Sequence, residues 1–157
     1  MIDLKEDIKE ILPQVIDWRR KIHQFPELGF KEFKTASLIK DVLKKTELEI
    51  VQYPDTTGVI AVLEGDKSGP VVGFRADMDA LEVTEQVDVP FKSKNKGVMH
   101  ACGHDFHVAL LMGAAKILSK YKKELKGKKV FVFQPAEEAP PGGAQDLVKK
   151  GMLEDHQ

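Results

Sequence analysis

The sequence lacks the features of a secreted or membrane-spanning protein. It has a single cysteine, Cys102, which excludes an intramolecular disulfide, and a lone thiol between His100 and His104 suits a reducing compartment. No apolar run is long enough to cross a membrane, and the N-terminal sequence MIDLKEDIKE has no apolar signal core. We therefore expect a cytoplasmic location and no membrane partner.

An excess of charge of one sign is also missing. The formal net charge is −1, and the 24 Lys and Arg residues are scattered rather than gathered in a long basic block. The most basic stretch, KYKKELKGKK at 120–129, is typical of a solvated helix end and loop, with nucleic-acid contact as the lesser alternative. There is no internal repeat and no low-complexity segment. The 157 residues are 42% hydrophobic and 31% charged, which predicts one globular domain with a sizeable core and no nucleic-acid partner.

Hydrophobic periodicity predicts four helical regions. Apolar residues recur every three or four positions from Leu4 to Ile22, where Pro13 predicts either a kink or a second helix that begins there. Further helices are expected at about 31–45, from Asp105 onward and at about 144–150. The helix from Asp105 is apolar around much of its circumference, which predicts that it is buried.

Short apolar segments between these helices predict strands at 49–53, 58–63, 71–74 and 130–133. The segment at 71–74 is wholly apolar, which predicts a strand buried on both faces. Residues 85–97 are polar and irregular, which predicts a loop or hairpin. Helices that alternate with apolar strands indicate an α/β fold with a mixed, mostly parallel sheet covered by helices.

Side chains that bind metal ions stand at the ends of three of these elements: Asp77 and Asp79, Cys102 and His104, and Glu137 and Glu138. Ligands of open α/β sheets gather beyond the carboxyl ends of the strands, so the three clusters can share one site. Gly103 allows a turn that points Cys102 and His104 toward one centre. Thiolate and imidazole donors suit zinc, cobalt, nickel or manganese rather than calcium. One glutamate can bind such an ion while the other takes a proton from its water.

Each of these residues also has an ordinary structural role open to it. Cys102 can be a small buried hydrophobic residue, the Glu137–Glu138 pair can be solvated surface, and Asp77 and Asp79 can cap a turn. Their placement at compatible element ends favours the metal site.

The remaining histidines carry less information, and one further mechanism stays open. His107 either forms a hydrogen bond beside its helix or supports a ligand, while His23 and His156 are expected to be ordinary surface or terminal histidines. A cysteine-nucleophile hydrolase built on Cys102 is a separate alternative. His104 is poorly placed to act as its base, because it stands only two residues away.

Four motifs in order resemble the signatures of the M20 metallopeptidase family: HQFPELGF at 23–30, FRADMDAL at 74–81, MHACGHDFH at 99–107 and FQPAEE at 133–138. They are most similar to its amidohydrolase branch, which includes N-acyl-L-amino acid amidohydrolases, hippurate hydrolases and auxin-conjugate hydrolases. The resemblance implies cleavage of the amide bond of N-acetyl- or N-benzoyl-type amino acids through a metal-activated water. It implies two divalent ions (Zn, Mn, Co or Ni) and no other cofactor.

Residue by residue, the resemblance implies roles for five side chains. Cys102, His104 and Glu138 match metal ligands, and Glu137 matches the general base. Asp77 stands in the place of a supporting catalytic aspartate, with Asp79 as its near competitor. A further residue, Glu82, departs from the family's usual proline, which bears on loop rigidity more than on chemistry.

The resemblance covers only the first part of the family's catalytic domain. Residues 1–157 match the N-terminal portion of that zinc-peptidase-like domain, which would then be incomplete at its C-terminus. The family's remaining metal-ligand histidines, and its smaller lid and dimerisation domain, lie beyond Gln157. The resemblance thus implies a small-molecule N-acyl amino acid as partner and a homodimer in the full-length form. The alternative is an inactive truncated fragment, or a module of a split protein, without the remaining ligands.

Overall fold

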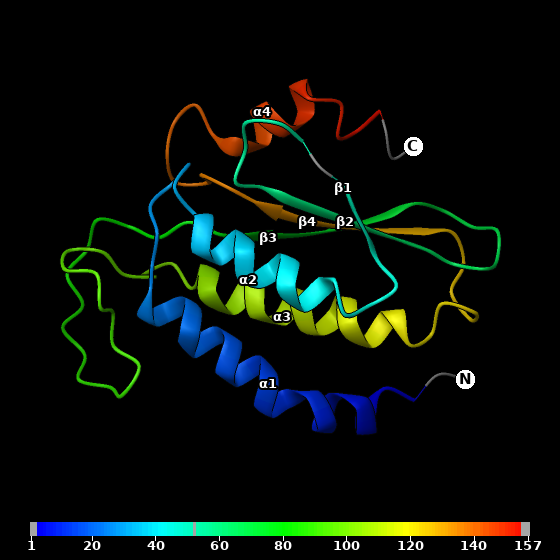
Figure 1. Cartoon of the computed structure of the whole chain (residues 1–157), viewed down its shortest axis with the longest axis horizontal. Helices are drawn as coiled ribbons and strands as arrows, with labels where there is room; N and C mark the ends of the chain where they lie inside the picture. Colours follow the sequence, from blue (N-terminus) through cyan, green and yellow to red (C-terminus); the bar gives the residue numbers. More distant parts are fainter. Residues whose placement is uncertain (1–2, 52, 155–157) are drawn as a thin grey trace.

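A mixed four-stranded sheet with helices on both faces forms the framework of the chain (Figure 1). The computed structural model describes residues 3–51 and 53–154. Its elements in chain order are α1 (Lys5–Gln24), α2 (Phe33–Leu43), β1 (Glu49–Val51), β2 (Val59–Glu64), β3 (Val72–Asp77), α3 (His104–Ser119), β4 (Lys128–Gln134) and α4 (Gly143–Lys149). The α/β fold is confirmed, and residues 85–97 form no helix or strand, as expected.

The strands lie in the order β1-β2-β4-β3. The β1–β2 and β2–β4 pairings are antiparallel, and β3 pairs with β4 in parallel. The mixed sheet is therefore confirmed, but parallel pairing does not predominate among the strands that the structure describes. One position of the expected strand at 49–53, Gln52, lies outside the described residues.

The main core lies between the sheet and the three helices α1, α2 and α3, which share one side of it in Figure 1. Phe131 and Phe133 of β4 are fully buried in this core, as are Ile39 of α2 and Met112 of α3. On the opposite face, Leu147 of α4 forms a second small cluster with residues of β2 and β4. Both faces of the central strands are thus covered. No helix in the described ranges is long and apolar enough to span a membrane.

Helix α1 runs without a break through Pro13, so a second helix beginning at that residue is the wrong alternative. Proline removes one backbone hydrogen bond from a helix interior. Pro13 is exposed, however, and the residues on either side of it, Ile11 and Trp18, are buried in the main core. Packing of α1 against α3 therefore maintains one helix across the proline.

The prediction that residues 71–74 form a strand buried on both faces is wrong. Strand β3 is the last strand of the sheet and pairs only with β4 among the described residues. Val71 and Val72 are 39% and 37% exposed, and burial begins only at Ala76, near the end of the strand. An apolar run identifies a strand, but its place in the sheet depends on pairings with distant segments.

Helix α3 is largely buried, as its apolar surface predicts. Val108, Met112 and Ala115 are fully buried under the sheet. Its outer side is open, with Phe106 and Leu110 exposed by 52% and 60%. The buried side fixes the orientation of the first turn of α3, which contributes to the candidate site.

Candidate metal centre

The ends of β3 and β4 and the start of α3 meet at one edge of the sheet. In the parallel pairing of β3 with β4, Asp77 is opposite Gln134, so Asp77 and the segment after β4 emerge together. Helix α3 begins at His104 beside them. The three clusters therefore meet through His104, which lies within ligand distance of Asp77 and of Glu137 and Glu138, whereas Cys102 is in neither group of ligand atoms.

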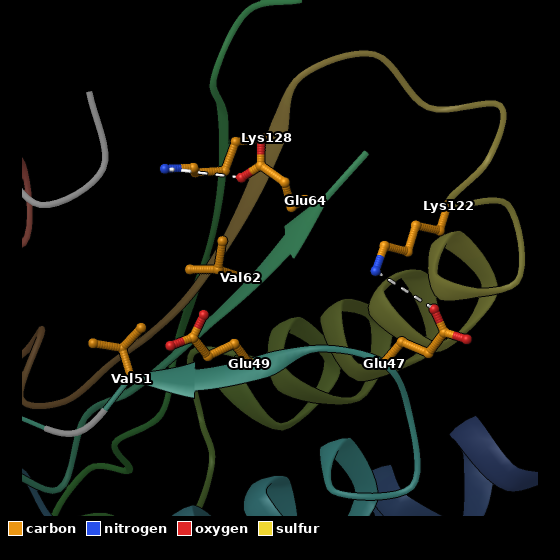
Figure 2. Close-up of a pocket in the computed structure, with 7 residues that line it drawn as sticks. All are labelled: Glu47, Glu49, Val51, Val62, Glu64, Lys122 and Lys128. Atoms are coloured by element: carbon orange, nitrogen blue, oxygen red, sulfur yellow. Dashed lines mark ion pairs between the residues drawn. The ribbon is translucent and has the colours of Figure 1, made fainter. Parts of the chain in front are cut away.

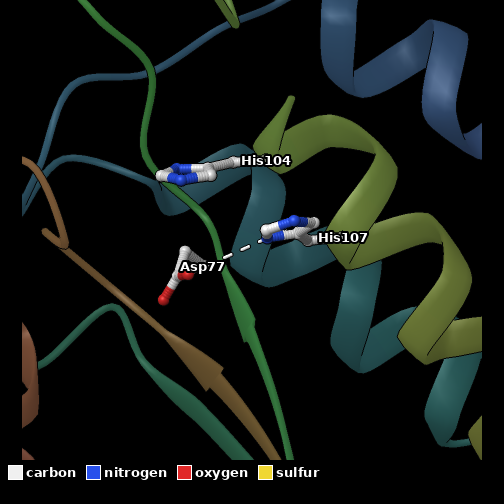
Figure 3. A group of neighbouring side chains, drawn as sticks. All are labelled: Asp77, His104 and His107. Carbon is white, nitrogen blue, oxygen red and sulfur yellow. Dashed lines mark ion pairs between the residues drawn. The ribbon is translucent and has the colours of Figure 1, made fainter. Parts of the chain in front are cut away.

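Two groups of potential ligand atoms form there, and His104 belongs to both. The first contains Asp77, His104 and His107, and the second contains His104, Glu137 and Glu138; within each group the ligand atoms lie within 4.8 Å of one another. Figure 3 shows the two imidazole rings at the start of α3 beside the Asp77 carboxylate. Nδ1 of His107 lies 3.8 Å from Oδ2 of Asp77. His107, whose role the sequence left open, thus belongs to the cluster.

Asp79 connects His104 to the segment after β4. Its carboxylate is buried, its carbonyl oxygen lies 2.9 Å from Nδ1 of His104, and its Oδ1 lies 3.3 Å from the same nitrogen. The backbone N–H of Glu138 donates to Oδ2 of Asp79 over 2.9 Å. When Nδ1 of His104 carries the proton, Nε2 keeps its lone pair for a metal ion. Asp79 therefore contacts the imidazole ring of His104 and the backbone N–H of Glu138, two of the proposed ligands.

The electrostatics of the Asp79–His104 pair support this arrangement. Hydrogen bonding to the Asp79 side chain, more than any other contact, raises the pKa of His104. Burial opposes ionisation of Asp79, yet the hydrogen bonds from His104 and from the Glu138 amide lower the pKa of the Asp79 carboxyl group. The carboxylate form of Asp79 is therefore the form that the fold stabilises.

Asp77 makes a different set of contacts from Asp79. Arg75 donates to Oδ1 of Asp77 from Nε over 2.8 Å and from Nη2 over 2.7 Å. The same Nη2 lies 4.0 Å from Oε1 of Glu137. Asp77 is thus held by a guanidinium group that also approaches Glu137, whereas Asp79 contacts His104 and Glu138.

Cys102 is exposed, so its alternative role as a buried hydrophobic residue is wrong. Its thiol faces Glu138, and hydrogen bonding to that carboxylate raises the pKa of the thiol, with a further contribution from Glu137. The surrounding carboxylates thus oppose a thiolate, while a bound cation would favour it. Thiol, imidazole and carboxylate donors together fit a zinc-like divalent ion.

Glu32 holds the turn that leads to Glu137 and was not singled out in the sequence. It is fully buried and accepts hydrogen bonds from the backbone N–H of Ala136, over 2.8 Å, and from the Thr57 hydroxyl, over 2.5 Å. Burial raises the pKa of Glu32. Ala136 has φ +49, which a non-glycine residue rarely adopts, so this turn depends on its contacts. The position of Glu32, between the HQFPELGF motif and α2, was the only available signal.

The expectation that His23 is an ordinary surface histidine is wrong. His23 is 5% exposed and contacts two carboxylates, those of Asp105 and Glu85. His100 is also buried, and burial lowers its pKa to about 4. The first residue of the HQFPELGF motif is His23, which was a signal of its importance. His156 lies outside the described residues.

Two cavities differ in their relation to this centre. One of about 450 Å³ lies against β1 and β2, and its lining contains two ion pairs, Lys122 with Glu47 and Lys128 with Glu64 (Figure 2). It shares no residue with the donor groups. A second, of about 410 Å³, includes Glu138 in its lining and therefore adjoins the centre.

Known proteins similar to this chain include hydrolases of two named activities. The sequence model of peptidase family M20/M25/M40 matches residues 73–157. The chain is 47% identical over 154 residues to thermostable carboxypeptidase 1 of Saccharolobus solfataricus, covering 96% of this chain and 39% of that protein. It is 45% identical over 152 residues to an N-acyl-L-amino acid amidohydrolase of Geobacillus stearothermophilus, covering 97% of this chain and 41% of that protein.

A solved structure is similar over nearly the whole chain. The YXEP protein of Bacillus subtilis, described as a dinuclear metal binding peptidase from the M20 family, superimposes with a TM-score of 0.87 and 45% sequence identity. The match covers 92% of this chain and 40% of that one. The chain therefore spans about two fifths of the length of each of these three proteins.

Proposed function

Because the chain belongs to peptidase family M20/M25/M40, we propose that it forms part of a metal-dependent amidohydrolase that cleaves N-acyl amino acids. The observation that carries the proposal is the group formed by His104, Glu137 and Glu138, with the Cys102 thiol facing Glu138. These are ligand types of hydrolytic zinc-like sites, gathered beside carboxylates that are able to accept a proton.

In this proposal Cys102, His104 and Glu138 hold metal, and Glu137 accepts the proton of the attacking water. A bound divalent ion lowers the pKa of water and polarises the amide carbonyl. Glu137 suits the base because its side chain is partly exposed and a guanidinium nitrogen of Arg75 lies 4.0 Å away. Asp77 supports the centre from β3. A pair of ions needs more donors than these, so the proposal includes ligands from outside residues 1–157.

The substrate class follows from what the similar proteins have in common. An N-acyl amino acid and the C-terminal end of a peptide both present an amide bond whose leaving group is an amino acid with a free carboxylate. N-acetyl or N-benzoyl amino acids are the first choice, by similarity to the amidohydrolase of Geobacillus stearothermophilus. Carboxypeptidase activity is the second candidate, because a protein of that name is comparably similar. Relative rates on N-benzoyl amino acids and on unblocked peptides distinguish the two.

The setting of the protein is part of the same proposal. A cytoplasmic location suits the exposed thiol of Cys102. In an oxidising compartment this thiol could be oxidised and would then no longer bind metal. A homodimer is proposed for the full-length form only, by resemblance to the family.

The experiment measures metal content and hydrolysis of N-acetyl and N-benzoyl amino acids by the purified chain and by any longer form of the protein. Substitution Glu137→Gln should retain bound metal and lower the rate by about 10²- to 10⁴-fold, because it removes the base. Glu124→Gln, the same change at an exposed position beyond the opposite end of α3, is the matched control and should leave the rate unchanged.

Two outcomes would contradict the proposal. Hydrolysis that survives a chelator would favour the cysteine-nucleophile alternative instead. If neither the metal-loaded chain nor a longer form of the protein hydrolyses these substrates, the remaining alternative is a non-catalytic module. Inactivity of the 157-residue chain alone, with activity in a longer form, would assign the missing function to the additional residues.

A further inference from the structure

The imidazole ring of His23 joins the end of α1 to the first turn of α3. Its Nδ1 lies 2.8 Å from Oδ2 of Asp105, and its Nε2 lies 3.1 Å from Oε1 of Glu85. All three side chains are nearly sealed from solvent, with exposures of 6%, 1% and 4%. A buried histidine bonded on both ring nitrogens is held in place, because any movement breaks a hydrogen bond between groups that are shielded from bulk solvent.

Arg19 strengthens the same connection. Its Nε lies 2.7 Å from Oδ2 of Asp105, the oxygen that also meets His23. Arg19 and His23 are four residues apart and therefore share one face of α1. The other carboxylate oxygen of Glu85 accepts a hydrogen bond of 2.6 Å from the backbone N–H of Ser93. This bond connects the loop after β3 to the residues around His23. Two helices and a loop are thus joined around the His23 ring through two carboxylates, those of Asp105 and Glu85.

Asp105 directly follows the proposed ligand His104 in the first turn of α3. Gly103, which precedes the helix, has φ +83 and forms no side-chain cap, and Cys102 before it is exposed. The amides of Phe106 and His107 bond to the Gly103 carbonyl, so the first turn moves as one unit. The contacts of Asp105 therefore act on the same turn that carries His104.

We propose that His23 is a positioning residue for the metal centre. Through Asp105 it holds the first turn of α3 at the place where the His104 ring meets Asp79. The metal-binding part of this inference rests on the proposed function. The placement of the His104 ring does not, because it is a property of the metal-free chain.

A purely stabilising role for His23 predicts a different result. Helices α1 and α3 also share apolar contacts, and a second polar link joins their other ends, where Asp7 meets Lys120, over 2.8 Å, and Tyr121. If His23 only fastens the helices together, removal of either link should have the same kind of effect. If His23 positions His104, only its own removal should disturb the His104 ring.

The experiment compares His23→Leu and His23→Gln with the matched control Asp7→Asn. The His104 ring is observed by NMR in the metal-free chain, and cobalt(II) affinity and the cobalt absorption spectrum are measured separately. In His23→Leu the His104 ring signals should shift, and cobalt affinity should fall about 10- to 100-fold, the usual effect of losing a residue behind a metal ligand. His23→Gln, which keeps a hydrogen-bond donor, should restore part of both. Asp7→Asn should lower thermal stability while leaving the His104 signals and cobalt affinity unchanged.

The outcomes separate this inference from the proposed function. Unchanged His104 signals in folded His23→Leu would overturn the inference, whatever the metal data show. Absence of cobalt binding in the unsubstituted protein would contradict the proposed function, while the NMR comparison would still decide the role of His23. If His23→Leu does not fold, Asp105→Asn, which removes the charge and retains the shape, is judged by the same criterion.

Discussion

At the scale of single residues, Asp79 contacts two of the proposed metal ligands, His104 and Glu138. It lies 3.3 Å from the His104 ring through its side chain and receives the Glu138 amide on its other oxygen. The two aspartates of FRADMDAL therefore have separate partners, since Asp77 pairs with Arg75. Their division of contacts follows from the way the chain turns at the end of β3.

Asp79→Asn should weaken metal binding by about 10- to 100-fold, because the amide removes the charge that orients the His104 ring. Isothermal titration with zinc measures the affinity. Asp88→Asn, the same change at an exposed loop position, should have no effect. Equal affinities in the two variants would argue against an orienting role for Asp79.

His100 gives the chain a dependence on pH that can be assigned to one residue. Burial lowers its pKa from 6.5 to about 4, so the folded chain keeps this ring neutral where the unfolded chain takes up a proton. The unfolded state binds more protons in that interval, and stability therefore falls as the pH drops from 6.5 to 4. The full interval corresponds to about 3 kcal/mol.

Replacement by a residue that does not titrate should remove this contribution. In the presence of a chelator, His100→Gln should lose less unfolding free energy than the unsubstituted chain between pH 6.5 and pH 4.5, measured by urea denaturation at each pH. Comparing the two slopes removes the contributions of other titrating groups, which the two proteins share. Parallel slopes would contradict the assignment to His100.

At the scale of elements, the connection that leads into β4 depends on Gly127, because a larger residue does not fit there. Gly127 has φ +64, and a Cβ atom there would lie 2.2 Å from the carbonyl oxygen of Pro70. Its own amide donates to the carbonyl of Lys67 over 2.6 Å, and its carbonyl accepts from Gly65 over 3.0 Å. These bonds bring the loop before β3 against the start of β4.

Gly127→Ala should destabilise the chain by about 3 kcal/mol, from the left-handed backbone and the collision with Pro70 together. Gly97→Ala is the matched control, because Gly97 has φ +79 but open space around it. It should cost about 1 kcal/mol, the backbone contribution alone. Thermal or urea unfolding measures the loss of stability in each variant. Equal losses in Gly127→Ala and Gly97→Ala would show that the contact with Pro70 adds nothing to the backbone contribution.

Local sequence patterns predict where the helices and strands lie better than they predict which of their residues are buried. The helices and strands were identified because periodicity is a property of a few neighbouring residues. The exposure of β3 was missed, since strand order depends on pairings between distant segments. The burial of His23 was missed for the same reason, as its partners Glu85 and Asp105 lie 62 and 82 residues away. The sequence identifies the donor clusters by their residue types and spacing. It does not show that Asp77 and Asp79 have different partners, because those partners depend on how the chain turns after β3.

At the scale of the whole molecule, the sheet presents an edge that can pair with other chains. Strand β3 has no neighbour on its outer side among the described residues, and Val71 and Val72 are exposed there. A strand edge with exposed apolar residues is a template for association. The chain should therefore self-associate through this edge as its concentration rises.

Val72→Lys should shift sedimentation toward the monomer, because a charged side chain on an edge strand opposes pairing between chains. Val87→Lys makes the same change at a loop position that is 57% exposed and outside the sheet. It should leave the association unchanged. A similar shift in both variants would attribute the effect to net charge rather than to the edge of β3.

The donors of the metal centre come from the end of β3, the start of α3 and the turn after β4, and they approach one another only when the sheet and α3 are packed. An unfolded chain holds these segments apart and offers no comparable site. Under the proposed function, metal binding and folding are one coupled equilibrium, in which free ion at 100 times its dissociation constant would add about 2.7 kcal/mol to the stability of the folded state. The metal supply of the cell would accordingly regulate how much of the chain is folded as well as how much is loaded.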